Sequence, residues 1–268
     1  MKAHLNKYNL LKFLFLSFLM SFFVLSCHPV TVSKYRTDNS HSLVISKDFK
    51  ITSLQAVFLN YGFYRAHSFQ SGFRINYKDI IIYIDPVAID LPIKADYIFI
   101  THPHVDHFSL NDIDKIYKES TVIIGPQQLE KKLKNYRFQS ISPNKKIDFR
   151  KFTCQTIPAY NYKHKFFDIA LHKEKKNYLG YVLTFDDIKI YHAGDTDDIE
   201  EIKQLKHITV ALIPIGEKRT AMNPIQAAKI VNQIKPKFVV PIHYKLNKGS
   251  EQLFKDCLNS EITVKLLH

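Results

Sequence analysis

Short runs of apolar, β-branched and aromatic residues alternate with polar turns along most of the chain. Ten of these runs have the length and composition of β-strands: 54–59, 73–77, 80–84, 97–101, 121–124, 152–157, 179–185, 188–192, 209–214 and 237–242. The first six follow one another closely, so we expect them to pair largely as hairpins or meanders. The pattern therefore predicts a domain that is rich in β-structure.

Helix signals lie between the later runs. Ser109 precedes LNDIDKIYK with an acidic residue three positions on, which approximates a capping box. Asn223 and Pro224 open PIQAAKIVNQI, whose apolar positions share one face. Further helices are predicted over 126–134 and from Ser250 to about Leu258. Many strands with interspersed helices argue for an α/β sandwich, in which helices cover the outer faces of the sheets.

The N-terminus has a different pattern. Residues 1–12 carry Lys and no acid, and residues 13–25 are almost entirely apolar, which fits the core of a signal peptide and is short for a bilayer span. The stretch ends at Val24-Leu25-Ser26-Cys27, which resembles a bacterial lipobox whose Cys27 becomes the lipid-modified first residue. An uncleaved anchor or a soluble exported protein are the alternatives. We expect a membrane-anchored lipoprotein outside the cytoplasm, either periplasmic or on the cell surface.

These features divide the chain into a signal peptide (1–26), a tether that leads into an entry strand (27–50) and one folded domain (51–268). The hydrophobic fraction of 46% and the charged fraction of 24% are those of a globular protein, and they exclude a disordered chain, a fibre and a coiled coil. The formal net charge of +13 favours anionic partners without specifying one. Cys154 and Cys257 are expected to be buried thiols.

The densest group of candidate ligands directly follows the predicted strand YIFI (97–100). The motif THPHVDH (101–107) contains His102, His104, Asp106 and His107. In extended backbone, residues two apart face the same side, so His102 and His104 can chelate one ion. The turn that follows can aim Asp106 and His107 at a second position nearby. Imidazole and carboxylate donors without thiolate suit zinc, and also manganese or iron.

The same motif resembles the metal-binding signature of the metallo-β-lactamase-fold hydrolases. Ile84-Asp85-Pro86, HAGDT (192–196) and PIHY (241–244) resemble further motifs of that family in the same order. The resemblance covers about residues 51–245 and implies a four-layer αββα sandwich with the metals at one edge of the sheets. It also implies that Asp195 bridges two divalent metals, that His243 binds the second metal, and that Asp85 supports the metal-binding loop from behind.

Three other stretches resemble one branch of this family. IPAYN (157–161), LGYV (179–182) and IPIG (213–216) are similar to the ascorbate-6-phosphate lactonase-like branch of the family. True β-lactamases of this fold usually carry Cys at the position of Asp195, so a β-lactam substrate is not expected.

One position departs from the family pattern. Most members supply a third His to the first metal, but here Ala159-Tyr160 is followed by Asn161. Either His164 or His172 could enter instead. Alternatively, the first metal has only His102, His104 and Asp195, which would make that site weak, or a single metal binds at the second position.

The expected activity is hydrolysis of a carbonyl or phosphoryl ester, such as a lactone, an ester or a phosphodiester. Bound metals lower the pKa of a coordinated water toward about 7, so that a hydroxide can attack the substrate at neutral pH. Asp106 would orient the nucleophile and move its proton. His192 either protonates the leaving group or is a strand-end histidine bonded to the backbone.

Three further residues are candidates for substrate binding. Asn161 could line the pocket, and Lys218 and Arg219 could bind an anionic group. A nuclease or phosphodiesterase is the alternative enzyme: the basic charge favours it, whereas the export signal makes nucleic acid an unlikely partner. A catalytically idle metal-binding lipoprotein is the third alternative. The expected partners are a small anionic or ester substrate and, through the lipid anchor, a membrane.

Overall fold

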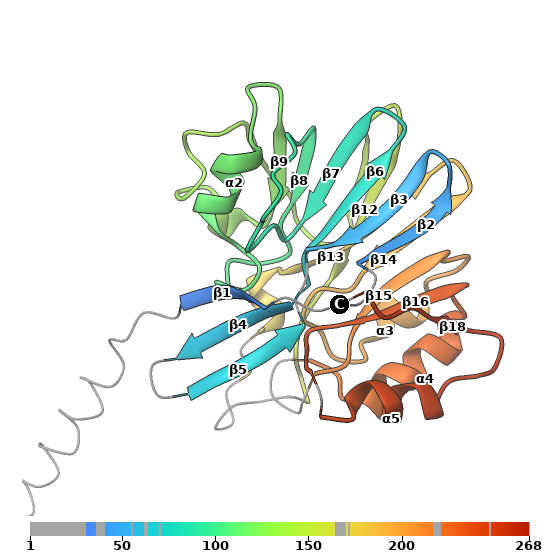
Figure 1. Ribbon diagram of the computed structural model, residues 1–268. Helices are drawn as coiled ribbons and strands as arrows, with labels where there is room; N and C mark the ends of the chain where they lie inside the picture. The colour runs from blue at the N-terminus through green and yellow to red at the C-terminus, as the bar shows by residue number, and fades with distance from the viewer. Residues whose placement is uncertain are drawn as a thin grey trace, which may run out of the picture.

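The computed structural model describes residues 31–35, 41–54, 56–61, 64–69, 71–163, 170, 172–216, 221–246 and 248–267. Two mixed sheets face each other, with α2 on the outer side of one and α3, α4 and α5 on the outer side of the other (Figure 1). This arrangement confirms the predicted α/β sandwich of four layers. Among the described helices, none is both long enough and apolar enough to cross a bilayer.

The first sheet has seven strands. Their order in space is β10 (Phe138–Ser140), β9 (Val122–Gly125), β8 (Tyr97–Phe99), β7 (Ile80–Ile84), β6 (Phe73–Tyr77), β3 (Phe49–Ser53) and β2 (Ser42–Ser46). β6 and β7 form an antiparallel hairpin, but β7, β8 and β9 pair in parallel. The prediction of hairpins or meanders was therefore wrong for these last three strands. Long connections, one of them containing α2 (Leu110–Ile116), return the chain to the same end of the sheet.

The second sheet also has seven strands. They run β11 (Lys146–Asp148), β12 (Thr153–Pro158), β13 (Leu179–Phe185), β14 (Ile188–His192), β15 (Val210–Pro214), β16 (Phe238–Ile242) and β18 (Thr263–Val264). From β14 onward the pairing is parallel, and the intervening connections carry α3 (Glu200–Lys203), α4 (Pro224–Ile234) and α5 (Ser250–Asp256). Because parallel strands end at the same edge, the loops after β14, β15 and β16 gather there.

A smaller sheet lies beside this edge. It consists of β1 (Thr31–Tyr35), β4 (Ala56–Tyr61), β5 (Tyr64–Phe69) and the two-residue β17 (Tyr244–Lys245). The run predicted at 54–59 is thus β4, and it joins this sheet rather than the one that contains β6. β2 and the first two residues of β3 lie in the segment 27–50 that is predicted to be the tether and its entry strand.

The helix ends follow the polar residues that the sequence offers. The Ser109 hydroxyl accepts a hydrogen bond from the backbone of Asp112 at the start of α2. Asn223 and Gln226 form a complete capping box at the start of α4. The helix predicted over 126–134 is only a 3₁₀ turn, η1 (Gln127–Leu129), because three lysines crowded into the next turn disfavour a short helix. A second 3₁₀ turn, η2 (Glu174–Lys176), precedes β13.

An aromatic cluster joins the two large sheets. The ring of Phe185 on β13 lies 5.1 Å from Phe49 and 4.9 Å from Tyr77, which belong to the first sheet. Its other neighbour, Phe152, stacks on it at 5.1 Å. Cys154 is buried near this core and Cys257 is half-buried; both are free thiols.

Truncating the Phe185 side chain should open a cavity between the sheets. We expect Phe185→Ala to lower the free energy of unfolding by about 3–5 kcal/mol. The control is Ile225→Ala on α4, where the side chain is 57% exposed and the change should stay within about 0.5 kcal/mol. Urea denaturation of both variants measures the difference; equal midpoints would contradict this account of the core.

Candidate metal centre

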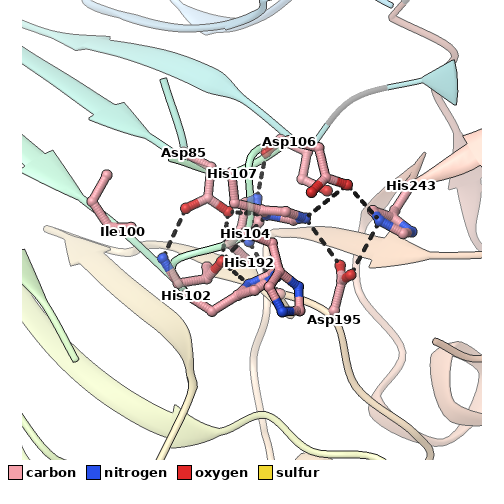
Figure 2. Close-up of polar contacts among 12 residues, drawn as sticks. Asp85, Ile100, His102, His104, Asp106, His107, His192, Asp195 and His243 are labelled. Atoms are coloured by element: carbon pink, nitrogen blue, oxygen red, sulfur yellow. Dashed lines mark hydrogen bonds and ion pairs between the residues drawn. The ribbon is translucent and has the colours of Figure 1, made fainter. Parts of the chain in front are cut away.

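The candidate residues converge at the edge where parallel strands of both large sheets end. Asp85 follows β7, and the loop with His102, His104, Asp106 and His107 follows β8. Asp195 lies three residues after β14, and His243 directly follows β16. Figure 2 shows these side chains pointing toward one another from the two sheets. The topology thus brings together ligands that are far apart in the sequence.

Asp85 organises the loop from behind. Its carboxylate accepts hydrogen bonds from the backbone N–H and the hydroxyl of Thr101, each at 2.7 Å, and from Nδ1 of His107 at 2.7 Å. The Thr101 hydroxyl in turn accepts from Nδ1 of His102 at 2.9 Å. Since both rings use Nδ1 as the donor, Nε2 of His102 and of His107 is the atom that faces the site and can bind a metal ion.

One cluster of nitrogens forms around His172. Its Nε2 lies 3.3 Å from Nε2 of His102 and 3.2 Å from Nδ1 of His104. These three ligand atoms are within 4.8 Å of one another, a spacing at which they could hold one metal ion. We call His102, His104 and His172 the first cluster. Of the two candidates for the third histidine, His172 lies at this cluster, and His164 lies outside the described residues.

A second cluster consists of Asp106, His107 and His243, whose ligand atoms also lie within 4.8 Å of one another. Asp195 stands between the clusters (Figure 2). Its Oδ2 is 3.1 Å from Nε2 of His243 and 3.6 Å from Nε2 of His172, and its Oδ1 is 3.4 Å from Nε2 of His107. A carboxylate in this position can contact an ion in either cluster.

Unpartnered polar atoms test whether a metal fits. Within the described part of the chain, Nε2 of His107 and Oδ1 of Asp195 are buried and make no hydrogen bond. These two atoms lie 3.4 Å apart, and a buried polar atom without a hydrogen bond costs about 1–3 kcal/mol. A cation between them would satisfy both, and imidazole and carboxylate donors suit zinc, manganese or iron. The residues present therefore fit a metal centre.

The two clusters differ in their electrostatics. Burial lowers the pKa of His102 well below its ordinary value and that of His172 to about 4. Burial would do the same to His107 and His243, but the neighbouring carboxylates, Asp195 foremost, outweigh it and raise both pKa values. Without metal, the first cluster is therefore neutral at pH 7, while the second holds protons.

The pKa values of the two carboxyl groups, Asp106 and Asp195, are lowered. Burial alone would raise the pKa of Asp106, but His107 and His243 together lower it to about 2. Burial likewise opposes ionisation of Asp195, and the same two histidines overcome it and hold its pKa well below the ordinary range. Both carboxylates are ionised at neutral pH, as metal ligands must be.

The backbone of His243 is in a conformation that few non-glycine residues adopt. Its φ of 52° is in the left-handed region, and Asp85 shares this feature with a φ of 47°. Gly216 makes room for His243, because a Cβ on Gly216 would lie 2.5 Å from the carbonyl oxygen of His243. The short β17 then begins at once and pairs with β5.

Two predicted site residues have other contacts. His192, proposed as a leaving-group acid, is fully buried: its Nε2–H donates to the Ser71 carbonyl at 2.6 Å and its Nδ1 accepts from Gly194. Both ring nitrogens are occupied, so it is the backbone-bonded strand-end histidine of the other interpretation. Asn161, proposed to line the pocket, is only 4% exposed and bonds to His172 and Asp197. Lys218, Arg219 and Cys27 lie outside the described residues.

The proton contents of the clusters predict different pH dependence of metal affinity. An ion that enters the second cluster must displace protons from His107 and His243, whose pKa values are raised, so its affinity should fall as the pH is lowered from 8 to 6. The slope approaches about tenfold per pH unit for each displaced proton. The metal affinity of the first cluster should change little over this pH range, because the pKa values of its histidines are lowered. Zinc titrations of the wild type and of His104→Ala, which retains the second cluster, measure this; a flat profile in His104→Ala would contradict it.

Comparisons with known proteins agree with this geometry. The Beta-lactamase superfamily domain matches residues 68–243. A UPF0173 metal-dependent hydrolase of Nanoarchaeum equitans is 35% identical over 184 residues, which cover 65% of this chain and 80% of that protein. Another from Thermococcus onnurineus is 36% identical over 172 residues, covering 60% and 72%.

Solved structures agree as well. The crystal structure of a candidate metal-dependent hydrolase from Parabacteroides distasonis superimposes with a TM-score of 0.64 at 30% identity, over 81% of this chain and 98% of that one. A metallo hydrolase from Ignicoccus hospitalis, at 21% identity and a TM-score of 0.59, shares the fold. With paired metal-ligand clusters at the edge of this sandwich, the chain belongs to the UPF0173 metal-dependent hydrolases of the metallo-β-lactamase superfamily.

Proposed function

We propose that this hydrolase cleaves a carbonyl or phosphoryl ester with two divalent cations, zinc being the preferred one, at the extracytoplasmic face of a membrane. The observation that carries the proposal is the position of Asp195 between two clusters of three donors each. Bound divalent cations supply Lewis acidity, which makes a water nucleophilic near neutral pH and stabilises negative charge on oxygen.

Asp195 and Asp106 have different roles in this proposal. Asp195 is 2% exposed and ionised, so it holds the two clusters together without contacting substrate. The side chain of Asp106 is 19% exposed, and its carboxylate is also ionised at neutral pH. Asp106 is therefore the acid that solvent reaches, and it can accept a hydrogen bond from the attacking water and take up its proton.

The substrate is a small ester or anionic molecule in this proposal. Lys218 and Arg219 follow β15, whose carboxyl end lies at the same edge as the ligands, and we assign them to an anionic group of the substrate. Because the net charge of +13 also favours phosphodiesters, phosphodiester cleavage is the second candidate activity.

Replacing Asp106 should remove turnover. We expect Asp106→Asn, loaded with zinc, to lose about 10²–10⁴-fold in hydrolysis of a panel of esters, lactones and phosphodiesters, because the amide cannot accept the proton. The matched control is Asp186→Asn, which changes a carboxylate that is 72% exposed in the turn at the opposite end of β13 and β14. Turnover by Asp106→Asn at the wild-type rate would refute the proposal, as would a zinc-loaded wild type that is inactive on the whole panel.

The membrane location rests on the sequence before β1. If Cys27 is acylated, only three residues separate it from Thr31, the first residue of β1. Four residues of extended chain reach at most about 14 Å. β1 pairs with β4, β4 with β5, and β5 with β17, which directly follows His243. A lipid on Cys27 would therefore hold the metal-centre edge close to the membrane surface.

Lipidation can be tested by itself. Cys27→Ser expressed with the native N-terminus should not be processed as a lipoprotein, and it should lose incorporation of radiolabelled palmitate because the acceptor thiol is gone. Cys257→Ser, which replaces a half-buried thiol in the domain, is the control and should keep the label. Labelling of Cys27→Ser at the wild-type level would exclude Cys27 as the acylated residue.

A further inference from the structure

We propose that Asn161, held by Asp197, is the positioning residue that makes His172 the third nitrogen donor of the first cluster. The inference rests on the metal-dependent function proposed above and concerns how this chain completes the cluster. The residues form a buried chain of hydrogen bonds, in which each partner determines the orientation of the next.

The chain of contacts begins at Asp197, which is fully buried. Its Oδ2 accepts the backbone N–H groups of Tyr162 at 2.8 Å and of Lys163 at 2.6 Å, so the carboxylate is fixed in place. Its Oδ1 accepts from Nδ2 of Asn161 at 3.3 Å. A carboxylate can only accept here, and the side-chain amide of Asn161 must therefore turn its nitrogen toward Asp197.

That orientation determines the tautomer of His172. With the nitrogen of Asn161 facing Asp197, its Oδ1 faces Nδ1 of His172 at 2.6 Å. An amide oxygen can only accept, so Nδ1 of His172 carries the proton and Nε2 does not. The same two residues are also joined through the backbone, where the N–H of Asn161 donates to the carbonyl of His172 at 2.7 Å.

The unprotonated Nε2 of His172 is the atom that faces the site. It lies 3.3 Å from Nε2 of His102, 3.2 Å from Nδ1 of His104 and 3.6 Å from Oδ2 of Asp195. Because Nδ1 of His102 donates to Thr101, Nε2 of His102 is also unprotonated. Two lone pairs at this distance repel each other unless a cation lies between them. Without an ion, Nδ1 of His104 can donate a hydrogen bond to Nε2 of His172, and a cation held by the three nitrogens would replace that proton. The orientation imposed by Asn161 thus suits metal binding.

Asp195 and Asp197 belong to the same loop after β14. Asp195 contacts the candidate ligand atoms directly, whereas Asp197 contacts them only through other residues. Asp195 lies between the clusters, while Asp197 acts on the first cluster through Asn161 and His172. Acceptors behind ligand histidines typically contribute 10–100-fold to metal affinity. The loss of Asn161 should therefore weaken the first cluster and leave the second unchanged.

The test compares Asn161→Leu, His172→Ala and the double variant by cobalt titration, with metal stoichiometry and visible absorption as readouts. We expect Asn161→Leu to weaken one of two binding events by about 10–100-fold. His172→Ala should weaken the same event at least as much, and the double variant no further, because Asn161 acts through His172. Asn259→Leu, which changes an exposed residue outside the metal centre, is the control. An Asn161→Leu variant with two wild-type affinities, or additive losses in the double variant, would overturn the proposal.

A measurement on the metal-free wild type needs no variant. Imidazole ¹⁵N chemical shifts at pH 7 should identify His172 as the Nδ1–H tautomer, the less common form in water, and an Nε2–H tautomer would overturn the proposal. The results also separate this inference from the proposed function. Two tight ions with no hydrolysis would refute the function alone, and two tight ions with an unaffected Asn161→Leu would refute the positioning role alone. An ion in the second cluster only would refute both.

Discussion

The metal centre depends on one constraint: each ligand imidazole must present an unprotonated nitrogen to the same small space. In water a histidine exchanges freely between tautomers. Here buried acceptors behind the rings remove that freedom, since Asp85 takes the Nδ1 proton of His107, Thr101 that of His102, and Asn161 that of His172. Nε2 of each ring then faces the site before any ion arrives, as a lone pair on His102 and His172 and as the atom that gives up a proton on His107, which lowers the reorganisation that metal binding requires.

The metal centre contains buried charges and backbone conformations of raised energy, and the surrounding fold keeps both in place. Burial by itself would lower the pKa of His107 and His243, but the neighbouring carboxylates raise it. Protons therefore occupy the second cluster when no metal ion is bound. Backbone conformations of order 1–3 kcal/mol above the usual minima persist at Asp85 and His243. The packed sheets, joined by aromatic rings such as Phe185, are rigid enough to maintain both features.

The sequence predicted those strands whose own side chains form a clear apolar pattern. The runs 73–77, 80–84, 179–185 and 188–192 have the same bounds as β6, β7, β13 and β14, because most of their apolar residues are buried in the core. Short strands at the periphery, such as β10 and β17, have no such pattern, since their pairing partners and not their side chains define them. The parallel pairing of β7, β8 and β9 was likewise missed, because spacing along the chain does not record strand direction.

For the metal centre, the sequence by itself determined which residue types were available and where strands would end: THPHVDH after an apolar run is sufficient to predict a metal-binding loop, and motifs further on supply Asp195 and His243. Only the tertiary structure placed Nε2 of His172 beside His102 and His104, and it assigned Asn161 and His192 to hydrogen-bond networks. The physical reason is that a ligand's role depends on what occupies its other hydrogen-bonding atom. Those partners, Asp197 behind Asn161 and Ser71 behind His192, come from segments that only the folded chain brings into contact.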